Sequence, residues 1–241
     1  MVKLLDCTTR DGGYDTNWNY SDEYVFNLID VLNKKGINYY EIGYRNYYEN
    51  GDKGQFYHCN PEVLKKFYER KGNLSLGVMT DVKRFNKADF LSANKDYIDF
   101  VRVAVHPDRI KDALSISELL KQRKYTVILQ LMDITNLGEE HFELLANFKN
   151  KNIFETVYLA DTYGTVQPEN VKKYFDKLKN IGYKNISFHA HNQNGQALTN
   201  SLTAIDSDAY SIDVVQNENG RNGGNLKHSE FIKNFKSCIC K

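Results

Sequence analysis

The sequence predicts a single (β/α)₈ TIM barrel, the α/β fold in which eight parallel strands alternate with helices. Eight short runs rich in β-branched and aromatic residues alternate with helical patterns, at a repeat of roughly 25–35 residues. Polar residues follow several of these runs directly. The 241 residues suit one such domain, so we expect 1–241 to form a single barrel. An open, doubly wound sheet is the alternative, but regular units with functional residues at several strand ends favour closure.

Capping residues and the spacing of apolar residues predict the first four strand–helix units. Ser21 is a typical N-cap, and Gly36 is a typical stop for the helix that Ser21 begins. Pro61, directly after Asn60, is typical of a first helical turn. The expected strands are 2–6, 39–44, 75–80 and 97–105, and the expected helices are 21–36, 60–71, 87–93 and 108–123.

The strand expected at 97–105 has two unlike faces. Valine occupies every second position from 101 to 105, so these side chains point the same way. The opposite face carries Arg102, Ala104 and His106. We therefore expect the valines to pack on helices and the mixed face to look into a polar cavity.

The second half of the chain repeats the pattern. Pro168 and Glu169 are typical of a first helical turn, and Gly182 is a typical stop. The expected strands are 126–132, 156–160, 186–190 and 211–215, and the expected helices are 138–148, 168–182, 196–205 and 226–235.

Two histidines stand at the end of the strand expected at 186–190. His189 and His191 are two positions apart, so they point to the same side of the strand. Paired imidazoles suit a divalent metal ion. The alternative is one buried, hydrogen-bonded core histidine and one surface histidine. In a barrel the C-terminal ends of all strands meet at one mouth, so further ligands are expected from other strand ends. The barrel places Asp11, Arg45, His106, Asp133 and Asp161, with the loop after Val215, around that mouth.

Four polar stretches follow the first, sixth, seventh and eighth strands: DCTTRDGG at 6–13, DTYGTVQP at 161–168, HAHN at 189–192 and GRNGGN at 220–225. Together they resemble the DRE-TIM metallolyase superfamily, also called HMG-CoA lyase-like, and among its members the 4-hydroxy-2-oxovalerate aldolase-like proteins. The resemblance covers all eight expected strands, and it implies that 1–241 form one catalytic domain without the C-terminal accessory domain of the bifunctional aldolases. It implies a metal-dependent aldolase, a carbon–carbon lyase that acts on an α-keto acid through a metal-bound pyruvate enolate.

The resemblance also implies the metal ligands. Asp11, His189 and His191 match the protein ligands of the family, and Asn225 matches an amide that supplies a fourth ligand. One carboxylate, two imidazoles and an amide leave exchangeable positions for a chelating α-keto acid. The favoured ion is Mn²⁺, with Mg²⁺, Co²⁺ or Zn²⁺ as alternatives.

Other roles follow from the same resemblance. Arg10 matches an arginine that binds the substrate carbonyl oxygen and stabilises the enolate, and Thr162 matches a residue that contacts the substrate carboxylate. The aldolases carry a histidine as a candidate base three residues after the metal aspartate, where this chain has Tyr14. We therefore expect Tyr14, Tyr163 or a metal-bound water to transfer the proton, with His106 as the rival.

Two further arginines are candidate substrate ligands. Glu41, Gly43 and Arg45 share one strand face, so Arg45 is expected to bind a substrate anion and Glu41 to support the metal site. Arg102 is expected to bind substrate from the mixed face of its strand. The alternative for all three charged residues is an internal ion pair, Glu41–Arg45 or Glu41–Arg102.

Composition narrows the partners and the location. With 32 basic and 31 acidic residues the net charge is +1, which argues against a nucleic-acid partner. No signal peptide or apolar run of membrane-spanning length is visible, so a cytoplasmic protein without a membrane partner is expected. The expected partners are an α-keto acid and an aldehyde, and a homo-oligomer stays open. The alternatives to an aldolase are an acyl-CoA-condensing synthase of the isopropylmalate synthase type and a non-catalytic metal-binding barrel.

Overall fold

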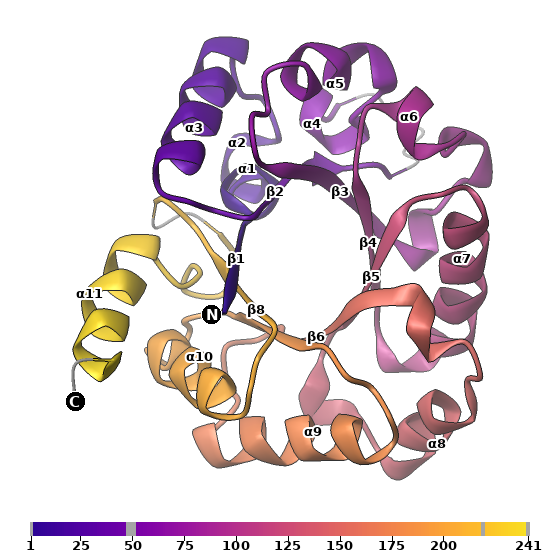
Figure 1. Cartoon of the computed structure of the whole chain (residues 1–241), viewed down its shortest axis with the longest axis vertical. Coiled ribbons are helices and arrows are strands. Elements are labelled where there is room, and N and C mark those ends of the chain that lie inside the picture. Colours follow the sequence, from indigo (N-terminus) through magenta and orange to yellow (C-terminus); the bar gives the residue numbers. More distant parts are fainter. Residues whose placement is uncertain (1, 47–51, 218–219, 240–241) are drawn as a thin grey trace.

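A computed structural model describes residues 2–46, 52–217 and 220–239, and these form a closed barrel (Figure 1). The strands follow one another around the barrel in chain order, and each pairs in parallel with its neighbours, β8 closing onto β1. The predicted TIM barrel is therefore confirmed. The strands are β1 (Lys3–Asp6), β2 (Tyr39–Tyr44), β3 (Ser75–Asp81), β4 (Phe100–Val105), β5 (Thr126–Leu131), β6 (Phe154–Asp161), β7 (Ile186–Ala190) and β8 (Ser211–Val214).

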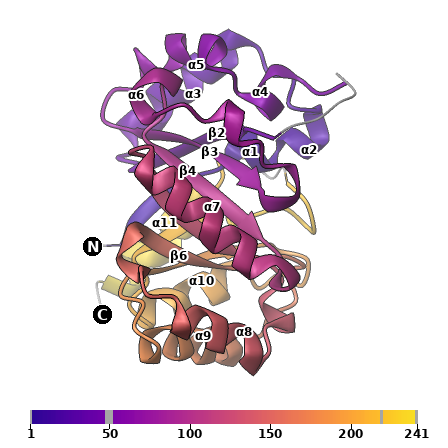
Figure 2. The same cartoon turned by 90° about the vertical axis from the view of Figure 1, so that its right-hand side faces the viewer.

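Helices surround the barrel, as Figures 1 and 2 show from two directions. The longer ones are α3 (Asp22–Lys34), α5 (Pro61–Tyr68), α7 (Ile110–Gln122), α8 (Glu139–Asn147), α9 (Pro168–Asn180), α10 (Ala197–Asp206) and α11 (His228–Ile239). Single turns that the sequence did not predict are α1 (Thr8–Asp11), α2 (Gly13–Thr16) and α4 (Gln55–His58). Short 3₁₀ turns are η1 (Val82–Arg84), η2 (Lys87–Asp89), η3 (Pro107–Arg109), η4 (Ile134–Asn136) and η5 (Lys151–Ile153).

Two boundaries differ from prediction around β4. The helix expected at 87–93 is absent, and its place is taken by η2 and by α6 (Ala93–Asp96). Strand pairing begins at Phe100 and not at Tyr97, because Tyr97 has a φ of 54° and ends α6 in a left-handed conformation that no strand continues.

Local sequence explains the helices that pack against the barrel. The side chain of Ser21 accepts a hydrogen bond from the backbone N–H of Tyr24 at 3.2 Å, the capping contact predicted for α3. The apolar residues of α3 lie on one face and are buried: Val25, Leu28, Ile29 and Leu32. Gly36 follows with a φ of +67°, which glycine adopts without strain.

The inside of the barrel changes character along its axis. Apolar and aromatic side chains fill the end nearest the strand starts, among them Leu5, Phe100 and Ile128. The valines of β4 instead pack outward in the core between strands and helices, as their spacing predicted. A charged layer built around Arg102 lies within the barrel, and a cavity opens where the strands end. Space for a ligand beside polar side chains is therefore found at the end of the barrel where the strands end.

Two cysteines have described side chains, Cys7 and Cys59, and both are buried and free. The side chain of Cys238 and the whole of Cys240 lie outside the described residues. Within the described chain, every helix is too short or too polar to cross a membrane.

Candidate active site

Asp11, His189 and His191 meet at the end of the barrel where the strands end. Asp11 is the last residue of α1, directly after β1, and the histidines come from the end of β7. One ligand atom from each residue lies within 4.8 Å of the others. All three side chains are buried, with exposed fractions of 0% to 2%. The same-face spacing of the histidines and the meeting of strand ends therefore assemble a group that can hold a metal ion.

The hydrogen bonds of the two histidines suit metal binding. Nδ1 of His189 lies 2.8 Å from Oδ2 of Asp213, and Nδ1 of His191 lies 2.9 Å from the carbonyl oxygen of Arg221. Both partners are acceptors, so each Nδ1 carries the hydrogen and each Nε2 is left with a lone pair. The two Nε2 atoms lie only 3.4 Å apart. Two lone pairs at this separation repel each other, and a shared cation would satisfy both.

Charge states fit the same conclusion. Burial is the main reason that the pKa of His191 falls to about 4, so this imidazole is neutral at neutral pH. Burial alone would raise the pKa of Asp11, but the charge of Arg10 and the nearby histidines hold it below its usual value. A neutral imidazole and an ionised carboxylate are the forms that bind metal.

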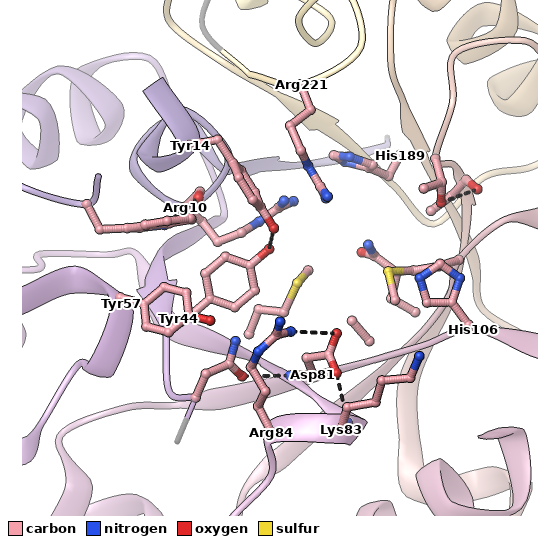
Figure 3. Close-up of a pocket in the computed structure, with 18 of the residues that line it drawn as sticks. Arg10, Tyr14, Tyr44, Tyr57, Asp81, Lys83, Arg84, His106, His189 and Arg221 are labelled. Atoms are coloured by element: carbon pink, nitrogen blue, oxygen red, sulfur yellow. Dashed lines mark hydrogen bonds and ion pairs between the residues drawn. The ribbon is translucent and has the colours of Figure 1, made fainter. Parts of the chain in front are cut away.

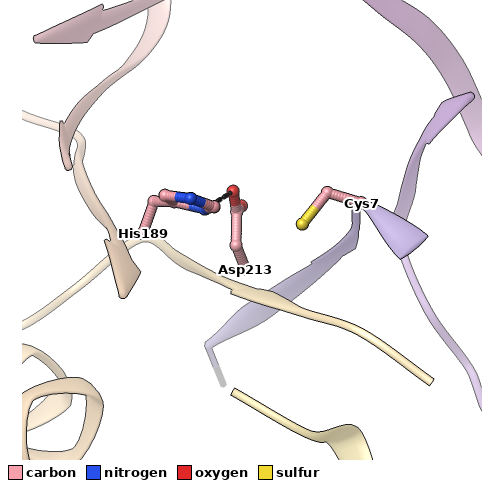
Figure 4. Close-up of side chains that lie close together, drawn as sticks. All are labelled: Cys7, His189 and Asp213. Carbon is pink, nitrogen blue, oxygen red and sulfur yellow. Dashed lines mark hydrogen bonds and ion pairs between the residues drawn. The ribbon is translucent and has the colours of Figure 1, made fainter. Parts of the chain in front are cut away.

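A second group of possible ligands, Cys7, His189 and Asp213, lies on the other side of His189 (Figure 4). Burial raises the pKa of the Cys7 thiol well above its usual value, and the thiol donates to the carbonyl oxygen of Val214 at 3.7 Å. Asp213 is already engaged by Arg102 at 2.6 Å. A protonated thiol does not bind metal well, so this group is not a second metal centre, and Asp213 within it orients His189 through the contact to Nδ1.

Asn225 stands beside the candidate metal centre. Its side-chain Nδ2 donates to Oδ2 of Asp11, and its backbone bridges to His191. The loop GRNGGN therefore brings an amide next to Asp11 and His191.

Arg10 is held by two carboxylates beneath the cavity. Its Nη1 lies 2.5 Å from Oδ1 of Asp11, and its Nε lies 2.5 Å from Oε1 of Glu41. Within the described part of the chain, Nη2 of Arg10 is buried and has no hydrogen-bond partner, although Arg10 lines the cavity. A buried donor without a partner is costly, so Nη2 is a natural contact for a substrate oxygen.

The ion pairs continue from Arg10 across the barrel. Oε2 of Glu41 lies 2.7 Å from Nε of Arg102, and Nη1 of Arg102 lies 2.6 Å from Oδ2 of Asp213. Together with Asp11 the network contains two guanidinium groups and three carboxylates. Its excess negative charge favours a divalent cation at the histidines.

The cavity above this network has a volume of about 500 Å³ and is shown in Figure 3. Predicted site residues that line it are Arg10, Tyr14, His106, Thr162, His189 and His191. The hydroxyl of Thr162 accepts a hydrogen bond from the backbone N–H of Asp133 at 2.7 Å. The hydroxyl of Tyr14 lies 3.2 Å from that of Tyr44.

The prediction that Arg45 lines the cavity is wrong. The pairing of β2 with β3 shifts register between Glu41 and Gly43, so a β-bulge reverses the faces of the residues that follow. Tyr44 therefore points into the cavity, and Arg45 points outward. The Arg45 guanidinium is buried and lies 3.0 Å from Oδ2 of Asp96.

The predictions that Arg102 binds substrate and that Tyr163 transfers a proton are also corrected. Arg102 faces the barrel interior as predicted, but it is fully buried in the ion-pair network and does not line the cavity. Of the predicted internal ion pairs, Glu41–Arg102 forms, whereas Arg45 pairs with Asp96. Tyr163 is 48% exposed and lies outside the cavity lining, because its neighbour Thr162 takes the inward position in the turn after β6.

Several site residues escaped the sequence reasoning. Ser211 and Asp213 are polar residues that alternate with apolar ones in a short strand, so they share one face. This alternation was a signal that the Asp213 carboxylate faces the inside of the barrel. Lys83 and Arg84 line the cavity, and their signal was a pair of adjacent cations that begins two residues after the end of β3. Tyr44 carried no local signal because the bulge changed its face.

Comparisons with known proteins identify the family of this chain. The family described as HMGL-like matches residues 106–238. An oxaloacetate decarboxylase of Mycobacterium tuberculosis is 28% identical over 226 residues, which cover 93% of this chain and 67% of that protein. A 4-hydroxy-2-oxovalerate aldolase of Geobacillus genomosp. 3 is 24% identical over 236 residues, which cover 96% of this chain and 69% of that protein.

Among solved structures, the N-terminal domain of a Bacteroides vulgatus protein described as an aldolase superposes with a TM-score of 0.90. It is 26% identical, and the match covers 100% of this chain and 81% of that one. This chain thus spans about two thirds of the length of its curated relatives. The chain belongs to the HMGL-like family, whose members are metal-dependent lyases, aldolases and decarboxylases.

Proposed function

We propose that this protein is a divalent-metal-dependent aldolase that cleaves or forms the carbon–carbon bond between C3 and C4 of an α-keto acid, one bond away from the keto carbon C2. Its substrates would be a 4-hydroxy-2-oxo acid in one direction, and pyruvate with an aldehyde in the other. The observation that carries the proposal is Nη2 of Arg10, a buried donor without a described partner at the floor of the cavity, beside the Asp11–His189–His191 group.

Asp11, His189 and His191 would hold the ion, with Asn225 at the fourth position. When bound, such an ion polarises the keto oxygen as a Lewis acid. Arg10 would donate from Nη2 to the oxygen that gains negative charge as the bond breaks. Because Asp11 and Glu41 already fix the guanidinium, it needs no rearrangement during the reaction, and preorganised donors stabilise a developing oxyanion most effectively.

Thr162 would position the substrate carboxylate. Its oxygen accepts from the N–H of Asp133, and its other described contact, the carbonyl oxygen of Ala160, is distant at 3.5 Å. The hydroxyl hydrogen can therefore turn toward an anion in the cavity.

Tyr14 would transfer the proton between the aldehyde oxygen and solvent. It lies on the Arg10 side of the cavity, whereas His106 lies across from Arg10 (Figure 3). Burial raises the pKa of Tyr44 well above its usual value, so Tyr44 stays protonated and can hydrogen-bond to the Tyr14 oxygen.

Exchange of the pyruvate methyl protons in D₂O tests the enolate step. Protein loaded with Mn²⁺ should exchange these protons, and the same protein treated with a chelator should not. A second assay should detect pyruvate released from 4-hydroxy-2-oxo acids. Absence of both activities with metal bound would reject the aldolase proposal and favour a non-catalytic barrel. Exchange of the acetyl-CoA methyl protons, without exchange of the pyruvate methyl protons, would favour the acyl-CoA-condensing alternative.

Decarboxylation of a 2-oxo acid such as oxaloacetate is the second candidate, because one relative at 28% identity carries that name. Both reactions break the C3–C4 bond and leave the enolate of pyruvate, and they differ in the fragment that leaves. Measuring CO₂ release from oxaloacetate beside pyruvate release from 4-hydroxy-2-oxo acids separates them. Mn²⁺ without protein is the necessary control.

A further inference from the structure

The cavity extends well beyond the space that a pyruvate unit needs. Its volume of about 500 Å³ lies in the range that encloses much larger ligands, about 300–1,000 Å³. Figure 3 shows Asp81, Lys83 and Arg84 on the wall that lies away from Arg221 and His189. These three residues come from the end of β3 and from η1. A substrate held at the metal centre therefore has room to reach this wall.

The charges that line the cavity are unbalanced. Lys53, Lys83, Arg84 and Arg221 line it, whereas Asp81 is the only carboxylate among the described lining residues. The charge of Arg10 is already offset by Asp11 and Glu41. The remaining lining groups thus carry an excess of positive charge in a partly enclosed space, where attraction for an anion is stronger than on an open surface.

Asp81 does not neutralise the wall. Its Oδ1 accepts the backbone N–H of Lys83 at 2.7 Å, and its Oδ2 lies 3.6 Å from Nη1 of Arg84. The side chain of Arg84 in this pair is 46% exposed, and such a long, exposed ion pair contributes little. Among the described residues, Lys83 has no carboxylate partner. Both cations are therefore available to a ligand.

We propose that Lys83 and Arg84 form a distal oxyanion subsite, so that the aldehyde half of the substrate carries a carboxylate or a phosphate. This inference rests on the proposed aldolase function, because the metal centre must hold the keto-acid end. In this proposal Lys83 and Arg84 take the anion-binding role that the sequence predicted for Arg45, because the β2 bulge turns Arg45 away from the cavity. The specificity of the enzyme is then for an anionic aldehyde and not for a small neutral one.

Two keto acids of equal chain length test the subsite by calorimetry on Mn²⁺-loaded protein. 2-Oxoglutarate ends in a carboxylate, and 2-oxopentanoate ends in a methyl group. Wild-type protein should bind 2-oxoglutarate about tenfold or more tightly than 2-oxopentanoate, since charged hydrogen bonds are the stronger ones. In the double variant Lys83→Gln/Arg84→Gln this ratio should fall to about one. Arg109→Gln, which removes an exposed cation outside the cavity lining, should keep the wild-type ratio.

The outcomes separate this inference from the proposed function. Metal-dependent binding of both keto acids with equal affinity overturns the subsite and leaves the aldolase proposal standing. Binding of 2-oxoglutarate alone, unchanged by a chelator and lost in the double variant, supports the subsite and rejects the metal-bound keto acid. A preference that persists in the double variant overturns the subsite, and binding of neither acid overturns both.

Aldol condensation with pyruvate then distinguishes the two kinds of oxyanion. Butanal, succinate semialdehyde and glyceraldehyde 3-phosphate offer a neutral, a carboxylate and a phosphate acceptor. Wild-type protein should use one anionic aldehyde at least about tenfold better than butanal in kcat/KM, and the double variant should lose that advantage. Equal use of all three aldehydes by wild-type protein would contradict the subsite.

Discussion

Oδ2 of Asp213 lies 2.8 Å from Nδ1 of His189, and this contact determines which ring nitrogen faces the candidate metal site. Burial would raise the pKa of Asp213, but Arg102 and His189 lower it to about 2, so it is an ionised acceptor at neutral pH. Nδ1 of His189 must therefore carry the hydrogen. Nε2 is left for the ion, in the arrangement by which carboxylates commonly orient metal-binding histidines.

Replacing Asp213 tests this orienting role. We expect Asp213→Asn to weaken Mn²⁺ binding about 10–100-fold, because the amide can present a donor to His189 and so disturb its orientation. Calorimetric titration with Mn²⁺ measures the effect. Glu155→Gln is the matched control, since this half-buried carboxylate instead pairs with Lys3. Equal affinities in wild-type protein and a folded Asp213→Asn variant would contradict the assignment.

Arg10 should be needed for turnover more than for metal binding. Arg10→Ala removes the Nη2 donor, and loss of one preorganised oxyanion donor costs about 10²–10³ in kcat, or roughly 3–4 kcal/mol. Arg10→Lys keeps a positive charge beside Asp11 and Glu41 but lacks the planar fork, so it should bind metal and still turn over slowly. Steady-state kinetics and Mn²⁺ titration of both variants check this. A kcat within a few-fold of wild type in either variant would reject the enolate-stabilising role.

The two tyrosines of the predicted site should behave differently. Tyr14 lines the cavity, whereas Tyr163 does not. We expect Tyr14→Phe to lower kcat about 10²-fold or more, as loss of a proton-transfer group typically does, with metal affinity unchanged. Tyr163→Phe should have a kcat close to wild type and is the matched control. Full activity of Tyr14→Phe beside an inactive, metal-bound His106→Ala variant would assign proton transfer to the histidine.

Arg45 should contribute to stability and not to substrate binding. Arg45→Ala leaves Asp96 as an uncompensated buried carboxylate, which typically costs about 3–5 kcal/mol of unfolding free energy. Arg70→Ala breaks an exposed ion pair with Asp30 and should cost only about 0–1 kcal/mol. Urea unfolding measures both. An Arg45→Ala variant of wild-type stability and raised KM would restore Arg45 as a substrate ligand.

Asp6 should make the protein less stable as the pH rises from about 4 to 6. Burial raises the pKa of Asp6 to about 6, although Gln216 and Thr8 donate hydrogen bonds to its carboxylate. At pH values between the pKa of Asp6 in the unfolded chain and its pKa in the fold, the native state binds more protons than the unfolded state. Protonated Asp6 therefore stabilises the fold fully in acid, and this stabilisation is lost as the pH rises through 6.

Between pH 4.5 and pH 7.5 we expect the free energy of unfolding of wild-type protein to fall by about 2 kcal/mol more than that of Asp6→Asn, because only wild-type protein carries this titrating group. Urea unfolding of both proteins at the two pH values measures the difference, and the comparison cancels the other titrating groups. An identical pH dependence in the two proteins would show that Asp6 titrates normally in the fold.

Local sequence was sufficient to predict the barrel and the meeting of Asp11, His189 and His191 at one of its ends. Strand periodicity put His189 and His191 on one face, and parallel strands deliver their ends to one mouth, so Asp11 could be expected beside them. Most helix ends were equally predictable, because caps such as Ser21 act within a few residues. The family resemblance added the role of Arg10, whose free Nη2 and paired carboxylates became visible only in three dimensions.

Tertiary structure alone decided which charged side chains reach the cavity. A one-residue bulge after Glu41 turned Arg45 outward and Tyr44 inward, and its cause is strand pairing that β2 by itself does not encode. Arg102 kept its predicted face but lies at the depth where Glu41 and Asp213 neutralise it. Depth depends on the stagger between neighbouring strands, which closure of the whole barrel sets. The periodicity of one strand specifies the face to which a side chain points. Only the closed sheet specifies which neighbours that side chain meets.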